Sequence, residues 1–99
     1  MNGDLSSFGL EDQAAIVTGA SQGIGQTLAI ALAQAGANVA VVSRTRSDLE
    51  AVAQKVEAAG RKALVRPTDL QDVSQIRKMI DEAHQTFGKI DILINNAAW

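Results

Sequence analysis

Four short apolar runs alternate with three stretches of helical periodicity, and this alternation constrains the fold more than any other feature of the sequence. The runs span residues 14–17, 39–42, 63–66 and 90–94, and each is short and mostly aliphatic, as expected of a buried strand. Strands that alternate with helices over short connections form parallel sheets with right-handed crossovers. The sequence therefore predicts an α/β fold with helices on both faces of the sheet.

Polar residues and glycines predict where the helices begin and end. The second helix is expected to start at Ser47, because Ser47 and Glu50 have the spacing of a capping box, and Asp72 with Gln75 offers a similar cap for the third. Gly36, Gly60 and Gly88 follow the periodic segments and are typical helix terminators.

Each predicted helix carries an apolar stripe that is expected to face the sheet. For the first helix, over residues 23–35, the stripe is Ile24, Leu28, Ala31, Leu32 and Ala35. For the second it is Leu49, Val52, Ala53 and Val56. For the third it is Val73, Ile76, Ile80, Ala83 and Phe87.

The composition excludes several classes of function. Nine Lys and Arg against eleven Asp and Glu give a net charge of −2, which offers no basic surface to nucleic acid or to an anionic membrane. With no cysteine and a single histidine, the chain lacks the usual zinc ligands, so no metal site is expected. Residues 1–13 hold no apolar leader and no run is long enough to cross a bilayer, so a cytoplasmic location is expected.

A glycine-rich segment, TGASQGIG at residues 18–25, lies between the first strand and the first helix. This is where a doubly wound sheet binds the pyrophosphate of a dinucleotide, at the N-terminus of the helix. Gly19 can adopt a backbone conformation closed to other residues, Gly23 lets the main chain approach the phosphates, and Gly25 permits close packing of helix on strand. The spacing predicts a dinucleotide site on a Rossmann-type fold, rather than glycines that serve a plain turn.

The residues after the second strand distinguish NAD from NADP. Proteins that bind NAD carry an acidic residue there for the ribose hydroxyls, whereas the 2′-phosphate of NADP requires a cation. This chain has Ser43, Arg44 and Thr45 and no carboxylate. Because Arg forms charge-assisted bonds to phosphate, the segment favours NADP over NAD. Taken alone, Arg44 is equally compatible with a solvated loop arginine.

Three motifs in this order resemble the short-chain dehydrogenase/reductase family, over about residues 10–98. Residues 18–25 are similar to the family's cofactor motif, and Asp69 with Leu70 is similar to its adenine-contacting acidic position. Residues 95–98 resemble its Asn-Asn-Ala-Gly motif, with Ala98 in place of the glycine. Gln22 stands where many NADP-using members carry Lys or Arg, so the NADP prediction depends on Arg44 and its neighbours.

The resemblance implies a role for each matching position. The residues that line the pyrophosphate are Gly19, Ser21, Gly23 and Ile24. Residues 43–45 hold the 2′-phosphate, and residues 96–98 follow the ribose on the nicotinamide side. Asp69 accepts a hydrogen bond from the adenine amino group, Leu70 packs on the ring, and Asn95 ties the fourth strand to its neighbours. The predicted cofactor-binding residues are Gly19, Ser21, Gln22, Gly23, Ile24, Gly25, Ser43, Arg44, Thr45, Asp69, Leu70, Asn96, Ala97 and Ala98.

The strand order that the resemblance and the pattern imply is 3-2-1-4, with the sheet truncated after the fourth strand. Residues 1–99 are therefore expected to be the N-terminal, dinucleotide-binding half of one Rossmann domain, preceded by a polar arm at residues 1–12. The outer edge of the strand at residues 90–94 is apolar and is expected to pair with another chain.

The absence of tyrosine limits what the chain can catalyse. In the family, a Tyr exchanges a proton with the carbonyl or alcohol, assisted by a Lys and a Ser, and all of these lie beyond the Asn-Asn-Ala-Gly motif. No catalytic residue is assigned here, and the 99-residue chain alone is predicted to be inactive. The expected function is the NADP(H)-binding part of an oxidoreductase that acts on a small carbonyl or alcohol and that can form a homo-oligomer. The alternative is a noncatalytic nucleotide-binding or interaction module that pairs through residues 90–94.

Overall fold

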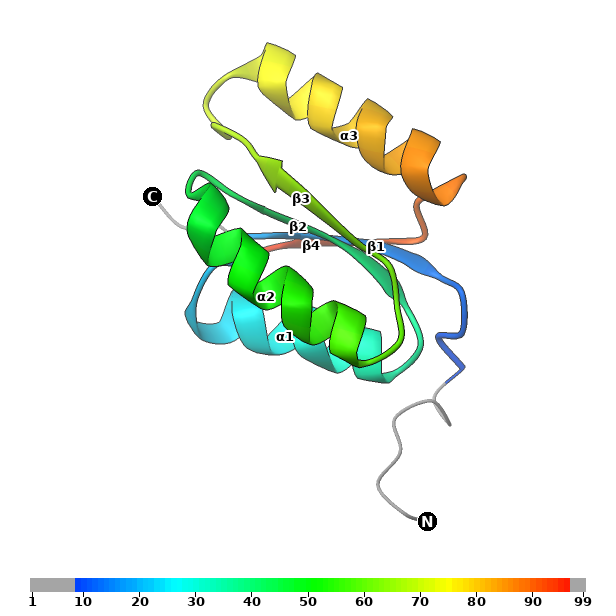
Figure 1. Ribbon diagram of the computed structural model, residues 1–99. Helices are drawn as coiled ribbons and strands as arrows, with labels where there is room; N and C mark the ends of the chain where they lie inside the picture. The colour runs from blue at the N-terminus through cyan, green and yellow to red at the C-terminus, as the bar shows by residue number, and fades with distance from the viewer. Residues whose placement is uncertain (1–8, 97–99) are drawn as a thin grey trace.

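The computed structural model describes residues 9–96, and all seven predicted elements are present in it (Figure 1). In chain order these are β1 (Ala14–Thr18), α1 (Gly23–Gln34), β2 (Asn38–Ser43), α2 (Arg46–Ala58), β3 (Ala63–Pro67), α3 (Val73–Phe87) and β4 (Ile92–Asn95). The bounds of β4 differ from the predicted 90–94, because pairing with β1 begins only where Ile92 comes opposite Ala15.

The four strands form one parallel sheet in the order β3-β2-β1-β4, as predicted. Val17 lies opposite Val41 of β2 and opposite Ile94 of β4, so the carboxyl ends of these three strands meet at the same edge. α1 and α2 cover one face of the sheet and α3 covers the other (Figure 1). The crossovers run outward from β1 to β3 and then return to β4, so helices fall on opposite faces and the fold is of Rossmann type.

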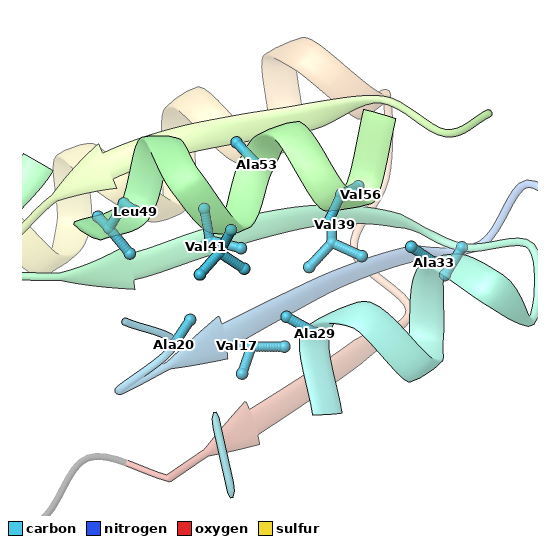
Figure 2. Packing of buried hydrophobic residues seen from close by; sticks show 11 residues of the cluster. Val17, Ala20, Ala29, Ala33, Val39, Val41, Leu49, Ala53 and Val56 are labelled. Carbon is cyan, nitrogen blue, oxygen red and sulfur yellow. The ribbon is translucent and has the colours of Figure 1, made fainter. Parts of the chain in front are cut away.

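Aliphatic side chains that alternate along the strands fill both faces of the sheet. Val17 and Val41 belong to the larger cluster, which packs against α1 and α2 (Figure 2), whereas Ile16 and Val42 belong to the smaller cluster under α3. All four side chains are essentially inaccessible to solvent. Strands that are buried on both faces show near-continuous apolar runs, which is why they could be located in the sequence.

The predicted stripe of α1 is only partly confirmed: Ala35 is buried and Leu32 packs against the larger cluster, but the contact with the sheet is made by other residues. The helix buries Gly25, Ala29 and Ala33 against the sheet, while Ile24 is 70% exposed. These three residues recur at every fourth position and have small or no side chains, so the helix axis can approach β1 closely. Because α1 is apolar on most sides, hydrophobic periodicity predicts the neighbouring stripe of larger side chains instead of these small residues.

The predicted start of α2 is also wrong, although its stripe is confirmed. The helix begins at Arg46 with Thr45 as its N-cap, and Thr45 makes no side-chain capping bond. Only two residues separate β2 from α2, so Ser47 already lies within the first helical turn and cannot cap it. The four residues of the predicted stripe are buried: Leu49, Val52, Ala53 and Val56.

The cap of α3 is confirmed and its stripe is partly confirmed. The Asp72 carboxylate accepts hydrogen bonds from the backbone N–H groups of Ser74 and Gln75. Met79 and Ala83 carry the contact with the sheet, whereas Val73 is 67% exposed. Apolar residues beside this contact line a cavity of about 340 Å³ between α3 and the sheet: Ile16, Leu70, Ile76, Met79, Ile80, Ile90 and Leu93.

The described residues that precede β1 are held against the loops that precede β2 and β3. Glu11 and Asp12, from the predicted polar arm, form ion pairs with Arg61, and the Asp12 N–H donates to the Gly36 carbonyl. Residues 1–8 of that arm lie outside the described residues. Within residues 9–96 no helix is long and apolar enough to cross a membrane.

Candidate functional site

A cavity of about 430 Å³ opens at the carboxyl ends of the strands, the edge where doubly wound sheets bind their ligands. It is bounded by the turn after β1, the loop after β2, the loop after β3 and the residue after β4. The lining residues are Gly19, Ser21, Gln22, Ser43, Arg44, Thr45, Thr68, Asp69, Leu70, Gln71 and Asn96. Segments far apart in the sequence therefore meet in one cavity, as the motif spacing predicted.

The glycines of the turn after β1 meet different physical requirements. Gly19 has φ +65° and Gly23 has φ +60°, values that favour glycine. Gly25 has no such φ, but a Cβ there would overlap the carbonyl of Gly19 and lie 2.8 Å from Asn96 Nδ2. Gly25 therefore lets α1 pack directly under the turn, as its spacing predicted.

The N-terminus of α1 is suited to an anion. Gln22 is the N-cap in an extended conformation, makes no side-chain capping bond, and the first turn contains no acidic residue. Backbone N–H groups of a first helical turn have no intrahelical partner, and the helix dipole adds positive potential there. Since Gln22 and Ser21 line the cavity, a phosphate in the cavity can accept hydrogen bonds from these N–H groups.

The loop after β2 brings a cation to the cavity. Arg44 is exposed, and among the described residues it forms no ion pair. The two residues that flank Arg44 are hydrogen-bonded to each other: the Thr45 N–H donates to Ser43 Oγ at 3.3 Å, which folds the loop into a compact turn. The guanidinium and two hydroxyls are therefore available to an anionic group in the cavity.

The loop after β3 is fixed to the loop after β2. The Thr68 N–H donates to the Ser43 carbonyl at 2.8 Å, and the Thr68 side chain, which is buried, donates to the Arg66 carbonyl. Next to it, Asp69 Oδ1 accepts the Gln71 N–H at 2.9 Å. Of the described residues that line the cavity, Asp69 is the only acidic one.

Thr18 connects the ends of β1 and β4 below the cavity. Its hydroxyl, at a residue that is 5% exposed, donates to Asn95 Oδ1 at 3.0 Å and accepts the Asn96 N–H at 3.0 Å. Asn95 thus ties β4 to its neighbour, as the resemblance implied, and Asn96 is fixed beside Gly25.

Two carboxylates near the ends of α3 have perturbed acidities. A hydrogen bond from the Ser74 hydroxyl, helped by backbone N–H groups, lowers the pKa of Asp72 despite some desolvation. The Ala14 N–H, which donates to Asp91 at 2.9 Å, is the main cause that lowers the pKa of Asp91, and Lys89 adds to it. Both carboxylates are held ionised by structural partners, and neither lines the cavity. No group of three or more potential metal ligands is found across residues 9–96.

Nine of the fourteen predicted site residues line the cavity: Gly19, Ser21, Gln22, Ser43, Arg44, Thr45, Asp69, Leu70 and Asn96. Gly23, Ile24 and Gly25 lie at the start of α1 beside it, and Ala97 and Ala98 lie outside the described residues. Sequence reasoning missed Thr68 and Gln71, which flank the predicted pair Asp69 and Leu70 on the same loop.

The sequence is similar to those of known oxidoreductases. The sequence model of the short chain dehydrogenase family matches residues 13–99. An uncharacterized oxidoreductase of Mycobacterium tuberculosis is 44% identical over 93% of this chain and 35% of its own length. The chain thus spans about a third of that relative.

Two solved structures show the same arrangement with different cofactors. A metagenomic short-chain oxidoreductase in complex with NADP is 36% identical, with a TM-score of 0.85 over 90% of this chain and 40% of its own. An NAD⁺-bound xylitol dehydrogenase is 31% identical, with a TM-score of 0.89 over 92% of this chain and 35% of its own. Since the family model covers nearly the whole sequence and the fold agrees with it, the chain belongs to the short-chain dehydrogenase family.

Proposed function

We propose that this chain is the NADP(H)-binding part of a short-chain oxidoreductase that transfers hydride between the nicotinamide and a carbonyl or alcohol substrate. The single observation that carries the choice of NADP is Arg44, a cation that lines the cavity without an ion-pair partner among residues 9–96. A 2′-phosphate would compensate that charge through hydrogen bonds from the guanidinium and from the hydroxyls of Ser43 and Thr45. An NAD-specific site would carry a carboxylate at this position.

The remaining parts of the cavity suit the rest of the cofactor. The uncapped N-terminus of α1 would hold the pyrophosphate, because its N–H groups and dipole favour an anion. Asp69 and Leu70, on the loop beside Arg44, would hold the adenine, and Asn96, at the end of β4, would contact the ribose on the nicotinamide side. When bound, the cofactor supplies the hydride chemistry, and these residues hold and orient it.

We propose further that residues 1–99 are the N-terminal half of one dinucleotide-binding domain. The relatives are about three times as long as this chain, and the described residues include no Tyr that could exchange a proton with a substrate. The acid–base residues, the substrate pocket and any homo-oligomer surface would then be supplied by polypeptide that follows in the relatives. The cavity described here would serve cofactor binding alone.

The test is cofactor binding by the full-length protein, measured by isothermal titration calorimetry with NADP⁺ and NAD⁺. We expect wild type to bind NADP⁺ more tightly by about tenfold to a hundredfold, the range for a charged hydrogen-bonded pair. Arg44→Ala should lose this preference, and Arg44→Asp should reverse it. Arg77→Ala, which removes an exposed arginine of α3 outside the cavity, is the matched control and should keep it. Equal affinity of wild type for the two cofactors would refute the choice of NADP.

A further inference from the structure

The first turn of α3 reaches back to the loop that precedes it. Gln75 Oε1 accepts the backbone N–H of Asp69 at 2.8 Å, and Gln75 Nε2 donates to Asp72 Oδ2 at 3.3 Å. The side chain that completes the cap of α3 therefore also holds the main chain at Asp69. A helix cap needs only the contacts with Asp72, so the bond to Asp69 is additional.

The Asp69 carboxylate is oriented by a second contact. Its Oδ1 accepts the Gln71 N–H at 2.9 Å, and the Asp69 carbonyl accepts the Asp72 N–H at 3.0 Å. Among residues 9–96, Oδ2 makes no hydrogen bond. One oxygen of the carboxylate is thus used to fix its plane, and the other is available to a donor in the cavity that Asp69 lines.

We infer that Gln75 is a positioning residue of the cofactor site, which holds the Asp69 main chain so that the Asp69 carboxylate can accept the adenine amino group. This inference rests on the proposed function, and it assigns a role to a residue that does not line the cavity.

The physical reason is the freedom of the loop between β3 and α3. Thr68 is anchored to β2 through the Ser43 carbonyl, and Asp72 belongs to the helix cap, so Asp69 lies between two fixed points. Without the Gln75 oxygen, the Asp69 N–H would donate to water instead, and the carboxylate would sample more orientations. Ordering it again on binding costs affinity, whereas a site that is already ordered avoids this cost.

The loss is expected at the adenine end of the cofactor alone. Arg44 and the loop after β2 are held by the Ser43 contacts, which do not involve Gln75. The N-terminus of α1 lies on a different element. A change at Gln75 should therefore alter recognition of the adenine amino group and leave recognition of the 2′-phosphate unchanged.

The experiment compares NADP⁺ with its analogue in which hydrogen replaces the 6-amino group of adenine. Binding of each to the full-length protein is measured by calorimetry, so no turnover is needed. We expect wild type to prefer NADP⁺ by about tenfold, because a hydrogen bond to a carboxylate is lost with the analogue. Gln75→Ala should reduce this preference to about twofold or less and keep the preference for NADP⁺ over NAD⁺.

Two control variants separate positioning from general weakening of the helix. Ser74→Ala removes the 2.7 Å bond between the Ser74 hydroxyl and Asp72 without touching Asp69, so it should lower stability and keep the amino-group preference. Gln75→Glu loses the donor to Asp72 Oδ2 and places a second carboxylate there, so it should also weaken the cap; it retains an oxygen that can accept the Asp69 N–H and should therefore restore most of the preference.

The outcomes also separate this inference from the proposed function. If wild type binds NADP⁺ and the analogue equally, the adenine role of Asp69 is wrong. If wild type prefers NADP⁺ and Gln75→Ala prefers it equally, Asp69 has its role and the positioning by Gln75 is refuted. Loss of the preference in Ser74→Ala to the same degree would also refute it, because any weakened cap would then suffice.

Discussion

Replacement of Gly25 by alanine gives a test in which local and tertiary effects have opposite signs. Gly25 lies in the first turn of α1 with an ordinary helical backbone, so helix propensity alone predicts that Gly25→Ala stabilises the protein by up to about 1 kcal/mol. The tertiary structure predicts the reverse. The new Cβ would overlap the Gly19 carbonyl and come within 2.8 Å of Asn96 Nδ2.

The magnitude follows from what must move. The Gly19 carbonyl is backbone and cannot rotate away, so α1 must shift from the turn; forced shifts of this kind cost about 3 kcal/mol. Set against the gain in propensity, we expect Gly25→Ala to lower the free energy of unfolding by about 2 kcal/mol. Cofactor affinity should fall too, because Gly19 and Asn96 both line the cavity.

The assay is urea unfolding of the full-length protein followed by circular dichroism, with Gly60→Ala as the matched control. Gly60 follows α2 with φ +84° and no atom near its would-be Cβ, so alanine there costs only the left-handed backbone, about 1–2 kcal/mol. Gly60→Ala should leave cofactor binding unchanged. A Gly25→Ala protein as stable as wild type, or more stable, would refute the close contact between α1 and the turn.

Two further predictions concern hydrogen bonds at the ends of the strands and helices. Thr18→Val keeps the shape of the side chain but removes the hydroxyl that serves Asn95 and Asn96, so the free energy of unfolding in urea should fall by about 1–3 kcal/mol, whereas Thr18→Ser should retain most of it. Because the pKa of Asp72 is lowered in the folded state, its contribution is fully present above its ordinary pKa and is lost as the pH falls through the folded value. Asp72→Asn keeps an oxygen that can cap the helix but loses the charge, so it should be less stable than wild type at neutral pH, and urea titrations in acid should show the difference shrink; a difference independent of pH would contradict a contribution from the ionised carboxylate.

Much of this architecture could be predicted because its determinants are local. β1 and β2 are apolar runs buried on both faces, and the turn after β1 requires glycine at Gly19 and Gly23 for their positive φ and at Gly25 for close packing. The strand order was implied by the resemblance to a doubly wound fold, and parallel strands in that order bring Gly19, Arg44 and Asp69 to one cavity at their carboxyl ends.

What could not be predicted depends on contacts between distant segments. The face of α1 is set by how closely a helix can approach β1, and small residues such as Ala29 and Ala33 decide this although Ile24 is far more hydrophobic. Similarly, Thr68 and Gln71 reach the cavity because the loop after β3 is bonded to Ser43, a contact that leaves no periodic signal in the sequence. Ser47 failed as a cap because the length of the preceding loop, rather than the residue type, determines where α2 begins.

The attachment of β4 has a consequence for local opening. Among residues 9–96 this strand pairs only with β1, and it is joined to β1 at both ends, through Asp91 with Ala14 and through Thr18 with Asn96. Detachment of β4 from β1 would therefore also withdraw Asn96 from the cavity. Local unfolding of this strand and loss of the part of the cavity that Asn96 lines would thus occur together. A ligand that contacts both Gly19 and Asn96 would oppose that event, so the amide protons of β4 would exchange with solvent more slowly when the ligand is bound.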